Sequence, residues 1–226
     1  MKATAGAGAP TELVVMSRWP APGRCKRRLA AGIGSIGAAR VQARLLQHTL
    51  AVARAARSSL PAGELRLVLA AEGVGLRASG RWARAMGMDQ GCGQGAGGLG
   101  LRLRRQLLAG WRRRATAVLV IGSDLPELEP ADLLAAVVAL RGAGAGQAPL
   151  LLGPAADGGY WLIGMGRPLI PRMSGLLLGG GPQPIDWGSS RVLAQTRAAA
   201  AAAGLSSQLL SQRHDLDRPV DLARWR

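Results

Sequence analysis

The segment 118–126 constrains the fold of this chain more than any other. It reads Val-Leu-Val-Ile-Gly-Ser-Asp-Leu-Pro, so four β-favouring apolar residues lead straight into Asp124 and a Leu-Pro step ends the strand. Such a strand is typical of an α/β sheet covered on both faces, where ligands gather at the carboxyl ends of the strands. Asp124 could there hold a divalent metal or accept a hydrogen bond from a ribose or sugar hydroxyl. The alternative, a cap for the helix expected from Pro130, would place Asp124 about six positions too early.

Apolar patterns elsewhere predict strands that alternate with helices. The expected strands are 13–16, 65–69, 117–122, 150–153, 160–163 and 207–210, and the expected helices are 36–57, 99–114, 130–141, 189–203 and 218–225. The glycine-rich segment 73–98 is expected to be mostly a long loop, and 165–186 a mobile flap. The alternation predicts a three-layer, Rossmann-like α/β fold with a mostly parallel sheet. It forms one domain over 12–226, after a disordered tail over 1–11.

The chain is strongly basic, with 29 Lys and Arg against 13 Asp and Glu and a formal net charge of +16. A nucleic-acid partner would suit this charge, but six Trp, one Tyr and no Phe leave few stacking platforms for single strands. A polyanionic substrate such as a nucleoside diphosphate also favours a positive cleft. Genomic base bias is a further source of scattered arginines.

The sequence carries no sign of a zinc site, a secretory signal or a membrane span. Its two cysteines and two histidines match no zinc or redox spacing. The first eleven residues lack an apolar core, and no apolar run approaches the length of a membrane span. We therefore expect a soluble cytoplasmic protein without membrane partners. Its oligomeric state cannot be read from the sequence.

Two loops carry candidate ligand contacts. In 18–29, five cations follow the first strand in a turn that contains Pro22 and Gly23, so Lys26 and Arg28 suit phosphate oxygens; the alternative is a solvated basic loop. The segment 95–100 matches G-x-G-x-x-G but follows no buried strand, so it is a poor dinucleotide fingerprint. Its glycines could still serve a helix N-terminus beside a ligand, with Arg102 one turn in.

Two further turns carry carboxylates. Asp157 follows the strand expected at 150–153, in a turn where it could either meet a ligand or satisfy its own backbone. Asp215 and Asp217 stand two positions apart, so their side chains point the same way if the stretch is extended. Asp217 could equally cap the terminal helix. Asp186 could be a simple cap, with Trp187 packed on the core.

Taken in order, these segments resemble a family of small bacterial GT-A-like transferases that are linked to arsenosugar biosynthesis. Its motifs are K-x-P-x-x-G-x-x-K-T-R-L, Q-G-x-x-D-L-G-x-R-M, G-S-D-x-P-x-L, G-P-A-x-D-G-G-Y and D-x-D-x-P-x-D-L. The corresponding segments here are 18–29, 94–103, 122–128, 153–160 and 215–222. Each motif is weak alone, but the ordered set of five is specific. This chain has Arg18 for Lys, Arg27 for Thr, Gly98 for Asp and Leu103 for Met; Arg27 and Gly98 weaken the donor-loop assignment.

The resemblance implies a nucleotide-diphospho-sugar transferase fold and Mg²⁺ or Mn²⁺ as cofactor. It implies that Pro22, Gly23, Lys26 and Arg28 line the nucleotide phosphates, that Gln94, Gly95 and Arg102 form the nucleotide-side loop, that Ser123 and Asp124 contact the donor, and that Asp157, Gly158, Gly159 and Tyr160 face the sugar or acceptor. Asp124 would bind the metal or the donor ribose, and Asp215 or Asp217 would complete the metal shell. Asp157 is the candidate general base.

The expected activity is glycosyl transfer from a nucleotide-diphospho-sugar to a small acceptor, within arsenosugar biosynthesis if the family link holds. The first alternative keeps the fold but forms a nucleotide-activated small molecule from a nucleoside triphosphate, with release of pyrophosphate. The second is a non-enzymatic basic protein that binds nucleic acid, with affinity that falls steeply as salt rises. Carboxylates gathered at strand ends argue against that alternative, because they repel a phosphate backbone unless a metal intervenes.

Overall fold

A computed structural model describes residues 9–142, 149–177 and 184–225. The strands are β1 (Thr11–Arg18), β2 (Leu65–Glu72), β3 (Gln90–Gly93), β4 (Ala117–Ile121), β5 (Leu150–Pro154), β6 (Tyr160–Gly166) and β7 (Ser207–Leu209). The helices are α1 (Arg27–Ser58), α2 (Leu76–Ala85), α3 (Leu99–Arg112), α4 (Pro130–Gly142), α5 (Ile170–Leu176), α6 (Val192–Ala202) and the 3-10 helix η1 (Pro219–Trp225). Most of the predicted tail, 1–11, falls on residues outside the described ranges, and Thr11 already belongs to β1.

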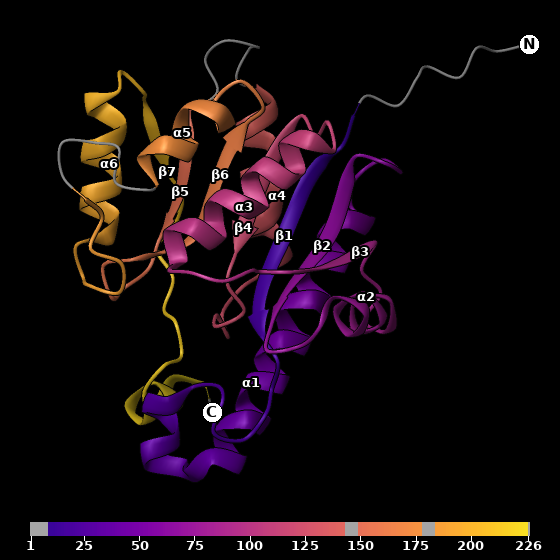
Figure 1. Cartoon of the computed structure of the whole chain (residues 1–226), viewed down its shortest axis with the longest axis vertical. Helices are drawn as coiled ribbons and strands as arrows, with labels where there is room; N and C mark the ends of the chain where they lie inside the picture. Colours follow the sequence, from indigo (N-terminus) through magenta and orange to yellow (C-terminus); the bar gives the residue numbers. More distant parts are fainter. Residues whose placement is uncertain (1–8, 143–148, 178–183, 226) are drawn as a thin grey trace, which may run out of the picture.

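The strands form one sheet in the order β3-β2-β1-β4-β6-β5-β7 (Figure 1). β6 runs antiparallel to β4 and β5, and the other paired strands are parallel, so the expected mostly parallel sheet is confirmed. The carboxyl ends of β1, β2, β3, β4 and β5 therefore lie along one edge of the sheet. The start of β6 lies at the same edge, because this strand points the opposite way.

Each face of the sheet packs against its own layer of helices. Along β1, Leu13 and Val15 join a core with α1, α2 and α4, whereas Val14 and Met16 join a core with α3, α5 and α6. This alternation follows from the two-residue period of a strand. Because both faces are covered, the central residues 13–16 of β1 are all apolar, whereas the buried Glu12 and Ser17 near its ends have polar partners. The three-layer prediction is thus confirmed.

The expectation of a long loop over 73–98 is wrong, because the segment contains α2 and β3. The glycines of β3 are the reason that the pattern was misleading. At Gly91 a Cβ would collide with the carbonyl oxygen of Ser79 in α2, so glycine lets the helix pack directly on the strand. The expected flap over 165–186 is also wrong in part, since β6 continues to Gly166 and α5 follows; residues 178–183 of it lie outside the described ranges.

A small lower lobe lies beyond the carboxyl edge of the sheet, formed by residues 27–33 of α1 and by η1 (Figure 1). Gly34 interrupts α1 with φ of 74°, a backbone conformation that suits glycine. Leu29 and Leu216 are fully buried and share a separate core with Leu222 and Trp225. The lobe faces the strand ends, so it supplies a second wall for any site there. Within the described residues, no helix has the length and apolar character needed to cross a bilayer.

Candidate functional site

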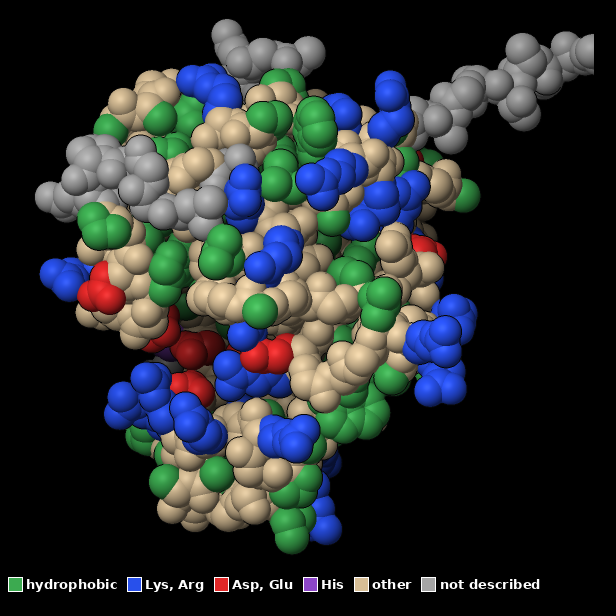
Figure 2. Space-filling model, in the orientation of Figure 1, with side chains coloured by type: hydrophobic (Ala, Val, Ile, Leu, Met, Phe, Trp, Pro, Cys, Tyr) green, Lys and Arg blue, Asp and Glu red, His purple; other side chains and the backbone are tan. Residues whose placement is uncertain are grey.

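A cleft of about 540 Å³ lies between the carboxyl edge of the sheet and the lower lobe. We call it the main cleft. Figure 2 shows the hollow from one side, with acidic side chains gathered in it and basic side chains around it. Predicted residues that line it are Lys26, Arg28, Gln94, Arg102, Ser123, Asp124, Asp157, Gly159, Tyr160, Asp215 and Asp217. Pro22, Gly23, Gly95 and Gly158 are not among its lining residues. The topology therefore brings most of the five sequence segments to one place.

Asp124 stands just beyond β4 and is tied to Lys26. Its Oδ1 lies 2.6 Å from Lys26 Nζ, which also donates to the backbone carbonyl of Leu216 at 2.5 Å. The Lys26 side chain is 4% exposed, whereas that of Asp124 is 48% exposed. Lys26 is therefore a buried tie between the strand end and the C-terminal segment, and its ammonium is already engaged. Asp124 keeps an open side toward the cleft and does not cap α4; at the start of that helix, Asp132 of the first turn accepts from the amide of Glu129, which precedes the helix.

A buried polar cluster fixes the ends of β1 and β4 beneath the cleft. The amide of Gln42, from α1, donates to the hydroxyl oxygens of Ser17 and Ser123 at 3.1 Å each, and Ser123 donates to Ser17 at 3.0 Å. Paired polar groups of this kind stabilise a specific geometry, because each would be costly if left alone. Ser123 thus positions Asp124 from below. Gln42 is a residue that sequence reasoning missed, since nothing marks one polar residue in a long helix.

One wall of the main cleft, beside the ends of β1 and β2, carries a carboxylate between two arginines. Glu72 Oε2 lies 2.7 Å from Arg18 Nε and 2.7 Å from Arg102 Nη1. Burial by itself raises the pKa of Glu72, but the hydrogen bonds from Arg102 and Arg18 outweigh it and lower that pKa below its ordinary value. Glu72 was also missed, because the second strand was expected to end at Leu69. Gln94 supports the same wall: its amide donates to the backbone carbonyls of Ser17 and Ala70.

The turn after β5 presents Asp157 to the cleft. Asp157 Oδ1 accepts from the amide of Gly159 at 2.8 Å. The alternative prediction, that Asp157 bonds to the backbone of its own turn, therefore holds for one of its two carboxylate oxygens. Gly158 has φ of +88°, and a Cβ there would collide with the carbonyl oxygen of Ser190. The turn therefore needs glycine in order to pack against the loop before α6. That loop brings Trp187 and Ser189 to the cleft, neither of which was expected there.

Asp215 and Asp217 come from the segment that leads into η1. Asp217 Oδ2 lies 3.0 Å from Arg28 Nη1, and the amides of Asp217 and Arg218 donate to Asp221, so Asp221 holds the start of η1. Burial raises the pKa of Asp215, and the negative charges of Asp157, Asp124 and Asp217 raise it further. Four carboxylates thus act on one another at the floor of the cleft.

We expect the Asp215→Asn protein, in EDTA, to melt at a higher temperature than the wild type at pH 7. The folded pKa of Asp215 lies above the unfolded value of about 3.9, so folding favours the protonated form. Wild-type stability should therefore rise as the pH falls through the folded-state pKa of Asp215. The higher melting temperature of the Asn variant should vanish once the pH is below the unfolded-state pKa. Circular dichroism melts across this range measure the effect. The exposed Glu129→Gln serves as control, and an equal gain in both variants would contradict the expectation.

The carboxylates do not form a closed metal cage. Across the described ranges, no group of three His, Cys, Asp or Glu side chains is arranged to hold a metal ion. Asp217 is paired with Arg28, while Asp124 and Asp215 keep oxygens near the cleft. Mg²⁺ is commonly held by one or two carboxylates together with substrate phosphates, so this arrangement fits a cation that binds with its substrate. The three-ligand set of Asp124, Asp215 and Asp217 stays a prediction.

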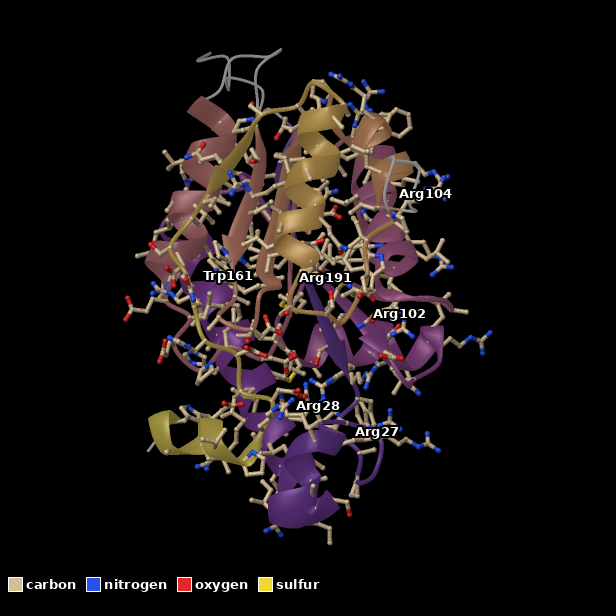
Figure 3. The ribbon with its side chains drawn as sticks, turned by 90° about the vertical axis from the view of Figure 1, so that its left-hand side faces the viewer. Arg27, Arg28, Arg102, Arg104, Trp161 and Arg191 are labelled. Carbon is tan, nitrogen blue, oxygen red and sulfur yellow. The ribbon has the colours of Figure 1, made fainter. Side chains whose placement is uncertain are left out.

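Arginines from two directions border the cleft (Figure 3). Arg27 and Arg28 lie on the lower lobe, and Arg102 and Arg191 lie on the body above it. Arg27, Arg28 and Arg102 line the cleft, whereas exposed Arg191 pairs with Asp186 at 2.9 Å. Cations and carboxylates therefore alternate along the cleft: Arg102 is paired with Glu72 beside β1 and β2, and Arg28 is paired with Asp217 in the C-terminal segment.

One protein-family model matches this chain. Residues 52–176 match the model described as "Uncharacterized protein conserved in bacteria (DUF2064)". No protein of curated function matches the chain.

Solved structures share the fold over nearly the whole chain. A candidate nucleotide-diphospho-sugar transferase from Desulfovibrio desulfuricans G20 has a TM-score of 0.73 at 22% identity, covering 92% of this chain and 82% of its own. Glucosyl-3-phosphoglycerate synthase from Mycobacterium tuberculosis, in complex with Mn²⁺, UDP and glucosyl-3-phosphoglycerate, has a TM-score of 0.54 at 16% identity, covering 96% and 76%. A nucleotidyl transferase from Methanothermobacter has a TM-score of 0.55 at 16% identity, covering 96% of both chains.

At such identities the likeness shows the fold alone, and the expected GT-A-like fold is confirmed. The fold is that of transferases of both the glycosyl and the nucleotidyl kind. Neither the family description nor these names mention arsenosugars, so that link stays a prediction.

Proposed function

This chain belongs to the DUF2064 family of bacterial proteins, and from its cleft we propose that it transfers a sugar from a nucleotide-diphospho-sugar to a small acceptor. The observation that carries the proposal is that one cleft is lined both by exposed arginines of the lower lobe and by the carboxylates Asp124, Asp157 and Asp215. The arginines suit a nucleotide diphosphate, and the carboxylates suit a divalent cation and a reacting hydroxyl. The Mycobacterium tuberculosis synthase, which shares the fold, is in complex with ligands of these two kinds, UDP and Mn²⁺.

Among the cations that line the cleft, Arg27 and Arg28 are the groups that can bind the diphosphate. Both lie exposed on the lower lobe and line the cleft. Guanidinium groups bind phosphate oxygens in pairs and stay charged throughout the reaction, so they can stabilise the negative charge that builds on the leaving nucleoside diphosphate. Lys26 holds Asp124 and Leu216 instead, and in this proposal it is a positioning residue rather than a phosphate ligand.

Among the carboxylates that line the cleft, Asp124 and Asp215 would hold Mg²⁺ or Mn²⁺ together with the diphosphate oxygens. Their mutual repulsion, which contributes to the raised pKa of Asp215, would be relieved by a cation near both. When bound, such a cation supplies charge neutralisation for the leaving group. Asp157 is the candidate base: its Oδ1 is held by the Gly159 amide, which orients the carboxylate toward an acceptor hydroxyl.

Nucleotidyl transfer is the second candidate. The Methanothermobacter nucleotidyl transferase shares the fold over 96% of both chains, so nothing in the architecture separates the two reactions. Attack at the α-phosphate of a nucleoside triphosphate would use the same arginines and carboxylates and would release pyrophosphate. A nucleic-acid-binding role is the weakest alternative, because carboxylates line the main cleft that the cations border.

A thermal-shift screen tests the proposal. Nucleotide-diphospho-sugars with Mg²⁺ or Mn²⁺ should raise the melting temperature by about 5 °C at ligand concentrations near 100 times Kd. EDTA should remove most of the shift. Nucleoside triphosphates that stabilise the protein and release pyrophosphate, without any response to nucleotide sugars, would replace glycosyl by nucleotidyl transfer. No response to either class would refute both.

A further inference from the structure

A second cavity of about 570 Å³ opens directly beside the main cleft. It lies between the segment 214–221, the turn that carries Asp157, and the loop before α6. The two cavities share the residues Arg28, Asp157, Gly188, Ser189, Asp215 and Asp217. The shared residues include the candidate base Asp157 and the candidate metal ligands Asp215 and Asp217, so a molecule in the second cavity can reach them.

The second cavity concentrates negative charge in a basic protein. Its lining includes the carboxylates of Glu127, Asp157, Asp215, Asp217 and Asp221, against the guanidinium groups of Arg28 and Arg218 and the imidazole of His214. The whole chain has 13 Asp and Glu against 29 Lys and Arg, so an average surface would show the opposite balance. The local field in this cavity is therefore set by its carboxylates.

Part of this charge is already neutralised, and the remainder faces the cavity. Asp217 is paired with Arg28 at 3.0 Å, and Asp221 accepts from two backbone amides. Asp157 accepts from one backbone amide. Glu127 is exposed and has no ion pair among the described residues.

We propose that the second cavity is the acceptor subsite and selects a small polyhydroxylated acceptor without an anionic group, an amino sugar above all. The inference rests on the proposed function. Hydroxyl and ammonium groups donate to carboxylates, whereas a phosphate or carboxylate on the acceptor meets like charge. The acceptor would thus differ in charge from phosphoglyceric acid, which is named in a complex of the Mycobacterium tuberculosis synthase.

In the transfer step, the acceptor hydroxyl oxygen forms a bond to the anomeric carbon of the donor sugar. The bond from that carbon to the diphosphate oxygen breaks, and its electron pair leaves with the nucleoside diphosphate. The hydroxyl proton passes to Asp157. Arg27 lines the main cleft alone, whereas Arg28, Asp157 and Asp215 line both cavities, so a donor in the main cleft and an acceptor in the second cavity would meet at these shared residues.

Glu127 offers a clean test, because it lines the second cavity and not the main cleft. Glu129 is its matched control: it is the same residue type, also exposed, two positions along the chain and outside both linings. Glu127→Lys and Glu129→Lys change the net charge equally. Only the first changes the charge within the cavity.

The measurement is NMR titration of the full-length protein with glucosamine, glucose and glucose 6-phosphate. We expect the wild type to bind glucosamine best and glucose 6-phosphate worst. Glu127→Lys should shift the preference between these two by about tenfold toward the phosphate, and Glu129→Lys should keep the wild-type order. A wild-type preference for glucose 6-phosphate, equal behaviour of both variants, or no binding of any of the three at millimolar concentrations would overturn the inference.

The same variants separate this inference from the proposed function. Nucleotide sugars should raise the melting temperature of both variants as they raise that of the wild type, because Glu127 lies outside the main cleft. Charge selectivity without any response to nucleotide sugars would retain the selective cavity and refute the glycosyl-transfer proposal. A nucleotide-sugar response without charge selectivity would refute the selective cavity and retain the glycosyl-transfer proposal.

Discussion

The Asp124→Asn protein should lose about 100-fold or more of its transferase activity while it stays folded. Asn keeps the shape of the side chain and an oxygen that can accept from Lys26 Nζ, now 2.6 Å from Asp124 Oδ1. It removes the negative charge that would hold a divalent cation beside the diphosphate. Metal-dependent nucleotide-sugar binding, measured by calorimetry with Mn²⁺ and again with EDTA, should disappear together with activity.

The control for this variant is Asp186→Asn. Asp186 is an exposed carboxylate paired with Arg191, and it lies one residue from the cleft-lining Trp187 without lining the cleft itself. Its replacement should change activity by less than about twofold, as for most surface positions. If Asp124→Asn retained activity within about tenfold of the wild type, or bound nucleotide sugar with unchanged affinity in Mn²⁺, Asp124 would not be the metal anchor.

The Lys26→Met protein should be less stable than the wild type by about 2 kcal/mol. Removal of one partner from a fully buried ion pair costs roughly 3–5 kcal/mol, and the half-exposed Asp124 reduces this through solvent screening. The change also removes the hydrogen bond to the carbonyl of Leu216, which links the lower lobe to the strand end. Urea unfolding, followed by circular dichroism, measures the difference.

Arg27→Met is the matched control, because it removes a neighbouring cation that is exposed. It should leave the free energy of unfolding within about 0.5 kcal/mol of the wild type while it weakens diphosphate binding. A double-mutant cycle with Asp124→Asn should show coupling for Lys26 and none for Arg27. Equal stability of the two Met variants would contradict the assignment of Lys26 as a structural tie and would return it to the phosphate site.

The sequence was most informative where local pattern and burial agree. Segment 118–126 predicts both β4 and the position of Asp124 beyond it, because a strand buried on both faces must be apolar throughout. It was misleading at β3, where Gly91 is chosen for the close approach of α2 rather than for strand propensity. The charge of Lys26 predicts a phosphate ligand, but the sequence alone does not predict that its ammonium is buried against Asp124 and the carbonyl of Leu216.

Residues that depend on distant partners were out of reach. Glu72 lies 54 positions from Arg18, and Gln42 lies 81 positions from Ser123, so no local pattern could relate them. The same holds for the second cavity, which collects Glu127, Asp157 and Asp221 from three separate segments. Such sets are products of topology. A sequence read alone can name the individual carboxylates but cannot group them.

The tie between Lys26 and Leu216 has a consequence for the order in which the protein is made. It joins residues 190 positions apart, and the lower lobe closes only when residues near the start of the sheet meet those of η1. Domains fold as their chain emerges from the ribosome, and contacts of long sequence separation form late. The six strands up to Gly166 can pair before residues 214–225 exist. The segment 214–225, which completes both cavities, is therefore made after every strand of the sheet, and the lower lobe can close only on a sheet whose strands are already synthesised.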